Sequence, residues 1–244
     1  MSEDGKAFGQ GILSVITNHI YWLAMLNFYF IVCNLLFLAF FLFLVPSFSN
    51  MVLYFLALIP TGPAITALFC CLNKLIREQD LSPTKDFFHH YKKNFFSSIK
   101  VWLPMLIVYF ILVVDFYYFN IQPLHLIQVL AGIFLVALGL ALTFSFYVFL
   151  LHAQFHFRVR DFYRLAVYYS FLKVKATTGN VAIVILTVFV LSITSDFLLL
   201  FGASVIAYLI ALNSNSLRGD VMSEFIEKEE QTEEEGDHEY KNII

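Results

Sequence analysis

Residues 59–64, which read Ile-Pro-Thr-Gly-Pro-Ala, interrupt a hydrophobic run that extends from Met51 to about Leu75. A proline removes a backbone amide donor and clashes with the preceding helical turn. In the hydrocarbon core of a membrane no water replaces a lost hydrogen bond, so the freed carbonyl groups need partners within the protein. The run therefore predicts a broken span that packs against polar or hydrated groups, and this requirement constrains the fold strongly.

Several other hydrophobic runs in the chain are long enough to cross a bilayer. The 244 residues are 60% hydrophobic and 14% charged, and the mean hydropathy is +0.77. Soluble domains are about half apolar and about a quarter charged. Repeated apolar runs of this length are typical of a polytopic helical membrane protein. The first run is too long for a signal-peptide core and lacks a small-residue cleavage site, so we expect it to be retained.

The hydrophobic pattern predicts an all-α bundle with six spans in residues 1–219. Under this arrangement all fifteen Lys and Arg residues fall on one side of the membrane. The positive-inside rule then places that side, and both termini, in the cytoplasm of a protein of the cell membrane. Residues 220–244 are acidic, and we expect a disordered cytoplasmic tail there whose role is open. The six spans cover about 20–45, 51–75, 101–119, 124–151, 180–194 and 197–212.

The two longer cytoplasmic connections each contain a predicted amphipathic helix. Both helices begin with a basic residue, an aspartate, a phenylalanine and a second aromatic residue, at Lys85 and at Arg160. Their apolar stripes predict helices that lie at the inner membrane interface. The shared start suggests an internal repeat. The stripes consist of Phe87, Phe88, Tyr91 and Phe95 in the first helix and Phe162, Leu165, Ala166 and Tyr169 in the second.

The broken second span and an asparagine of the first span are predicted at similar depths. Thr61 lies about 15 Å from the outer end of its span, and Asn34 lies about 20 Å from the inner end of its own span. Asn34 could then bond to carbonyls freed by Pro60 or Pro63 and fix the packing of the two spans. Alternatively, the broken helix forms a midplane site, as in transporters. The candidate residues are Asn34, Pro60, Thr61, Gly62, Pro63 and Ala64.

Motifs for enzymatic or metal chemistry are missing from the sequence. It contains no Gly-x-Ser-x-Gly, no His-Glu-x-x-His and no glycine loop that would cradle a phosphate. His152 and His156 are four residues apart, but no cysteine or carboxylate stands at a matching spacing. The basic connections adjoin anionic lipid headgroups, which explains them without nucleic acid. We therefore expect a non-enzymatic protein whose first partner is the lipid bilayer, without a cofactor or a metal.

Three short motifs resemble those of the YesL-like family of bacterial integral membrane proteins, a domain of unknown function. They are Asn34-Leu35-Leu36-Phe37 in the first span, Gly62-Pro63-Ala64-x-x-Ala67-Leu68 in the second span, and Phe87-Phe88 followed by Asn94-Phe95 in the first connection.

Members of that family are found beside genes for carbohydrate uptake and polysaccharide degradation in Gram-positive bacteria, often with binding-protein-dependent sugar transporters. The resemblance therefore implies an accessory or regulatory partner of a carbohydrate ABC transporter. The alternative is a small transporter or channel with its site at the broken second span. The resemblance assigns no catalytic residue, and it names neither a particular sugar nor an oligomeric state.

Overall fold

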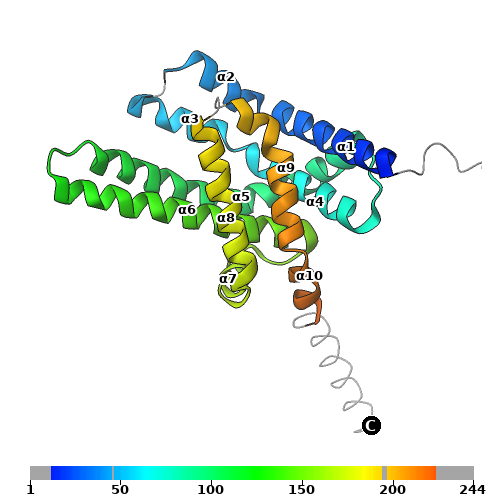
Figure 1. Cartoon of the computed structure of the whole chain (residues 1–244). Helices are drawn as coiled ribbons and strands as arrows, with labels where there is room; N and C mark the ends of the chain where they lie inside the picture. Colours follow the sequence, from blue (N-terminus) through cyan, green and yellow to red (C-terminus); the bar gives the residue numbers. More distant parts are fainter. Residues whose placement is uncertain (1–11, 46, 194–196, 224–244) are drawn as a thin grey trace, which may run out of the picture.

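The computed structural model describes residues 12–45, 47–193 and 197–223, and within them the chain is helical without any strand (Figure 1). The predicted all-α class is therefore confirmed for the part of the chain that the structure describes. A short 3-10 turn at Phe48–Asn50 leads into α3. The α-helices are α1 (Ile12–Cys33), α2 (Leu35–Phe43), α3 (Met51–Ala57), α4 (Thr61–Glu78), α5 (Pro83–Asn120), α6 (His125–Gln154), α7 (Val159–Leu172), α8 (Val174–Ile193), α9 (Phe197–Asn213) and α10 (Ser216–Val221).

The helices confirm the membrane character of the chain but not the number of spans. Three helical segments, Ser14–Cys33, Pro83–Asn120 and Ile127–Gln154, are long and apolar enough to cross a membrane. The count rises to five if α3 with α4, bent by 44°, and α7 with α8, bent by 97°, each form one span. The apolar helix Gly202–Asn213 in α9 is shorter than this criterion. Six spans and cytoplasmic termini therefore remain predictions.

Two predicted boundaries differ from the helices in the structure. The first span was expected to begin near residue 20, but α1 begins at Ile12, and the helix is interrupted at Asn34 before α2 continues. The first amphipathic helix and the third span form one helix, α5, whose 38 residues extend about 57 Å. A hydrocarbon core of about 30 Å accommodates only part of that length, so α5 also extends beyond the membrane.

The helices pack around a core at one end of the bundle. Figure 1 shows α5 and α6 as a long antiparallel pair, with α1 to α4 beside them. Helix α9 contacts α1, α4 and α8. The largest buried side chains gather where α4, α5, α6 and α7 meet, and many exposed residues elsewhere on α5, α6 and α8 are apolar, as a lipid-facing surface requires. The aromatic residues among the largest fully buried side chains are Phe69, Phe87, Tyr147, Phe149, Phe162 and Tyr169.

The same end of the bundle carries most of the basic side chains. Three contacts tie its helices together: Cys70 of α4 to α6, Ser98 of α5 to His152 of α6, and Tyr163 of α7 to the Val101 carbonyl of α5. We call it the basic end, and the positive-inside rule predicts that it faces the cytoplasm. Its basic residues include Lys74, Arg77, Lys85, Lys92, Lys93, Arg158, Arg160, Arg164 and Lys173.

A sharp bend separates α7 from α8 at the basic end. The Thr177 hydroxyl lies 2.8 Å from the Ser170 carbonyl and 2.9 Å from the Tyr147 hydroxyl, and it links both sides of the bend to α6. Lys173, at the bend, forms an ion pair of 2.5 Å with Asp220. Asp220 belongs to α10, so the helical part of the chain extends past the predicted start of the acidic tail. Residues 224–244 of that tail lie outside the described residues.

Candidate functional site

The break in the second hydrophobic run is a tight turn between α3 and α4. Helix α3 ends at Ala57 and α4 begins at Thr61. Within the turn, the Ile59 amide donates to the Leu56 carbonyl and the Thr61 amide donates to the Leu58 carbonyl. The turn therefore recovers backbone hydrogen bonds in the stretch where Pro60 cannot donate one.

Trp102 of α5 packs directly against this turn. Its indole Nε1 donates a hydrogen bond of 2.8 Å to the Leu58 carbonyl. A Cβ atom on Gly62 would lie 2.5 Å from Cβ and 2.6 Å from Cγ of Trp102, which is closer than non-bonded carbon atoms approach. Glycine at this position therefore allows α5 to approach α4, and the indole ring covers the break. Trp102 is itself buried.

The break between α1 and α2 faces the break between α3 and α4. Thr61 Oγ1 donates a hydrogen bond of 2.5 Å to Asn34 Oδ1, while Asn34 Nδ2 donates to the Phe30 carbonyl at 2.8 Å. The structure thus brings Asn34 and Thr61 together. Their bond joins two side chains, and the extra donor to a carbonyl of the turn is Trp102 instead of Asn34.

The remaining candidate residues of the break are buried in the protein. Pro63 and Ala64 lie inside the bundle, and Ala64 has no exposed surface. The Thr66 hydroxyl donates to the Gly62 carbonyl at 3.2 Å. Both polar atoms of the Asn34 side chain have partners, and so does the hydroxyl of Thr61. The break therefore offers a ligand few polar groups that are not already engaged.

The aromatic stripes of the two connecting helices face other helices. In α7, the buried residues are the four residues of the predicted stripe. In α5, Phe87 is fully buried, and its ring lies 5.8 Å from that of Tyr29 in α1. Phe88 also contacts Tyr29, at 5.2 Å between ring centroids. Tyr91 and Phe95 are partly buried and contact each other. The stripes thus dock both helices onto the bundle.

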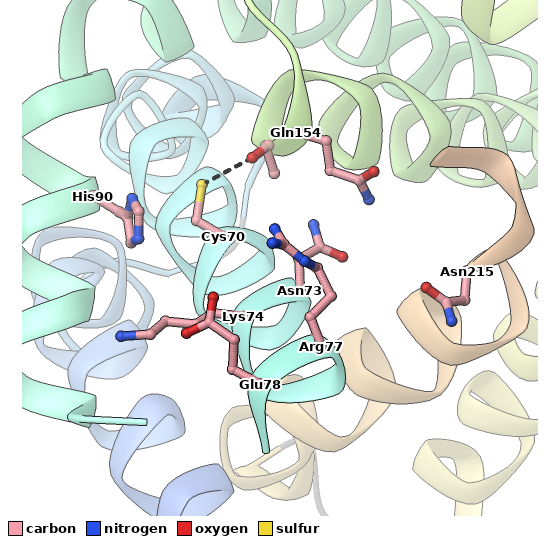
Figure 2. A pocket seen from close by; sticks show the side chains of 9 residues that line it. Cys70, Asn73, Lys74, Arg77, Glu78, His90, Gln154 and Asn215 are labelled. Atoms are coloured by element: carbon pink, nitrogen blue, oxygen red, sulfur yellow. Dashed lines mark hydrogen bonds between the residues drawn. The ribbon is translucent and has the colours of Figure 1, made fainter. Parts of the chain in front are cut away.

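A polar pocket opens at the basic end between α4, α5 and α6, close to the connection from α9 to α10 (Figure 2). Its volume is about 210 Å³. Five of its nine lining residues belong to the C-terminal half of α4. The lining residues are Cys70, Asn73, Lys74, Arg77, Glu78, His90, Ala153, Gln154 and Asn215.

Some polar groups of the pocket are already engaged. Lys74 Nζ forms an ion pair of 2.8 Å with Asp86, and the Ser82 amide donates to the same carboxylate. Burial raises the pKa of Asp86, but these two hydrogen bonds, together with the charges of Lys74 and His90, hold its pKa below the usual value. Burial, followed by the charge of His89, lowers the pKa of His90 and favours its neutral form. Asp86 and His90 precede the predicted span at 101–119.

Two of the α4 residues in the pocket, Asn73 and Arg77, carry donor groups without a partner among the described residues. The Nδ2 atom of Asn73 is buried and donates to no hydrogen-bond acceptor among the described residues. Arg77 is exposed and forms no ion pair or hydrogen bond in the part of the chain that the structure describes. Both side chains come from α4 and line the same pocket (Figure 2). The sequence signal was their spacing of four residues, which places both on one face of a helix.

No group of three or more metal-ligating side chains occurs among the described residues.

Comparison with known proteins relates the chain to an uncharacterised family. Residues 23–116, less than half of the chain, match the family described as "Protein of unknown function, DUF624". The match includes both helix breaks, Trp102 and the α4 and α5 side of the pocket.

A second similarity is to the uncharacterized protein YteU of Bacillus subtilis (strain 168). The two sequences are 27% identical over 169 residues, which cover 66% of this chain and 75% of YteU. No solved structure matches the chain. These similarities support a helical membrane protein related to a family without an established function.

Proposed function

We propose that the chain is a non-enzymatic protein of the cell membrane that acts as an accessory or regulatory partner of a carbohydrate ABC transporter in a Gram-positive bacterium. The YesL-like resemblance points to carbohydrate uptake. We favour an accessory role over transport by the chain itself because the polar side chains at the break in the second hydrophobic run are already hydrogen-bonded within the protein.

A transport site at the break would need polar groups that are free to bind a substrate. Instead, Asn34 and Thr61 bond to each other, and Trp102 bonds to the Leu58 carbonyl. Gly62 gives its space to the Trp102 side chain. These contacts favour a structural role, in which the break forms a joint that holds α1, α4 and α5 together. They weigh against the alternative of a small transporter or channel with its site at the break.

An accessory role needs a surface for a partner protein, and two exposed phenylalanines near the basic end are candidates. Phe96 of α5 is 77% exposed and Phe171 of α7 is 79% exposed. Both residues come after the stripes that pack inside the protein. Because their own rings are exposed, they are accessible to a partner protein in the membrane. Aromatic side chains are frequent anchors of protein interfaces.

Capture of the tagged full-length protein from the source bacterium in a mild detergent tests this proposal. We expect subunits of a sugar ABC transporter to co-purify with the native protein and to be lost when Phe96 and Phe171 are both replaced by alanine. Phe43→Ala, which removes an 83% exposed ring from the end of α2, is the matched control and should retain the partner. Recovery of the native protein without any transporter subunit would contradict the proposal.

A further inference from the structure

We propose that the pocket at the basic end binds one phosphate-type oxyanion, either as a free phosphate or as the phosphate of a lipid headgroup. The inference is independent of the proposed transporter partnership. It assigns a ligand class to the pocket between α4, α5 and α6, with Arg77 and Asn73 as the residues that bind it.

The free groups at the centre of the pocket are hydrogen-bond donors. An unpartnered buried donor such as Asn73 Nδ2 is costly, and native proteins normally satisfy it with a protein group, a water or an ion. The Arg77 guanidinium, which lines the same pocket, offers a planar fork of N–H groups that suits the oxygens of a phosphate. Figure 2 shows the Gln154 side chain on the opposite wall, where its amide adds a third donor.

Glu78 also lines the pocket, and its carboxylate lies close to the charge of Lys74. Glu78 is four residues after Lys74, whereas Arg77 is four residues after Asn73, so the two pairs occupy neighbouring faces of the helix. Lys74 is engaged with Asp86 at 2.8 Å and also lies in the field of Glu78. Lys74 therefore balances the nearby carboxylates, and the charge of Arg77 remains available to an anion.

The size and position of the pocket fit a single small group. Pockets for drug-sized ligands have volumes of about 300–1,000 Å³, and this pocket, at about 210 Å³, is smaller. It lies at the basic end, where the positive-inside rule places the headgroups of the inner leaflet and the cytoplasm. Both environments supply phosphate oxyanions, and anionic lipid headgroups bind in basic pockets between membrane helices.

Binding by the purified full-length protein in a non-ionic detergent tests the inference in two arms. One arm titrates inorganic phosphate by calorimetry at constant ionic strength. The other arm uses native mass spectrometry to compare phosphatidylglycerol with diglucosyldiacylglycerol, a lipid without phosphate. Binding in the first arm identifies a free phosphate as sufficient, and selective retention of phosphatidylglycerol identifies a headgroup.

The variants Arg77→Gln and Asn73→Leu should each weaken binding at least about tenfold in the arm in which the native protein binds, as expected for a lost charge-assisted or buried hydrogen bond. Arg160→Gln removes another exposed arginine of the basic end that does not line the pocket, and this variant should bind the anion like the native protein. If Asn73→Leu fails to fold, the comparison of Arg77→Gln with Arg160→Gln decides whether the pocket binds the anion.

Two results would overturn the inference. One is the absence of binding by the native protein in both arms. The other is an equal loss of binding in Arg77→Gln and Arg160→Gln, which would show that the anion responds to the general positive charge of the basic end.

Discussion

The helix break near Pro60 and the pocket at the basic end are both polar regions of a mostly apolar protein, but they use their polar atoms differently. At the break, Thr61 bonds to Asn34 and the indole of Trp102 bonds to a carbonyl. In the pocket, the Asn73 amide nitrogen and the Arg77 guanidinium have no partners among the described residues. The most conspicuous motif of the sequence is thus a joint, and the less conspicuous pair is free for a ligand.

Their surroundings explain this difference. A polar group in hydrocarbon has no water as an alternative partner, so a break within a span is stable only when neighbouring helices satisfy it. At the end of the bundle, water or an ion can occupy a pocket, and an unpaired donor costs less there. The comparison therefore predicts that substitutions at the break change stability and that substitutions in the pocket change binding.

The largest effect on stability is expected from Gly62→Ala. The new Cβ would lie 2.5 Å from Trp102 Cβ, an atom that moves only with the backbone of α5. We expect the free energy of unfolding to fall by about 3 kcal/mol, the upper end of the usual cost of overpacking. Thermal unfolding in detergent, followed by a thiol-reactive dye on the buried Cys70 and Cys71, measures it.

Gly132→Ala is the matched control for this substitution. Gly132 lies in α6, and a Cβ there would meet no atom within 4 Å. Alanine is favoured over glycine in a helix by about 0.5–1 kcal/mol, so this variant should be slightly more stable than the native protein. Equal effects of the two substitutions would mean that Trp102 does not close the break.

The second effect is the loss of the indole hydrogen bond in Trp102→Phe. The ring remains aromatic, but the Leu58 carbonyl loses its donor from α5. We expect a decrease of about 1.5 kcal/mol in the free energy of unfolding, as for a buried hydrogen bond whose acceptor keeps one other partner. An unchanged unfolding midpoint in the same dye assay would show that the indole hydrogen bond of Trp102 does not stabilise the break.

A smaller effect is expected from the bond between Asn34 and Thr61. In Thr61→Val the hydroxyl donor is lost while the shape is kept. Hydrogen bonds between membrane helices contribute about 0.6 kcal/mol on average. A double-mutant cycle with Asn34→Ala measures the coupling between the two side chains, and a coupling of zero would show that they act independently.

The smallest change in stability is expected in the pocket. Arg77 is exposed and unpaired, so Arg77→Gln should alter the free energy of unfolding by less than about 0.5 kcal/mol. The same variant is expected to lose oxyanion binding. A large loss of stability would indicate that Arg77 supports the fold. It would contradict the prediction that substitutions in the pocket change binding and substitutions at the break change stability.

The sequence was sufficient to predict features that depend on local pattern. The all-α class follows from the apolar runs, the break follows from Pro60 and Pro63, and the stripe of α7 follows from its helical spacing. The length of α5 was not predicted, because the amphipathic segment and the span were treated as separate elements although no helix breaker lies between them.

Contacts between distant segments could not be predicted in the same way. Trp102 lies 44 residues after Leu58, and no local pattern indicates that its indole reaches that carbonyl. The pocket needs α4, α5, α6 and Asn215 together, and only tertiary packing places them around Asn73. The spacing of Asn73 and Arg77 was visible in the sequence, but the sequence did not show that residues of α5, α6 and the α9–α10 connection complete a pocket around them.

The central claim is that the break is closed to water and the pocket is open. Labelling by a charged, water-soluble maleimide tests this directly, in a protein whose native Cys33, Cys70 and Cys71 are replaced by alanine. Only the thiolate in contact with water reacts readily. The account predicts rapid modification of Arg77→Cys, at an exposed position of the pocket, and no modification of Thr61→Cys under native conditions. Modification of Thr61→Cys at a similar rate would contradict it and would restore the break as a candidate transport site.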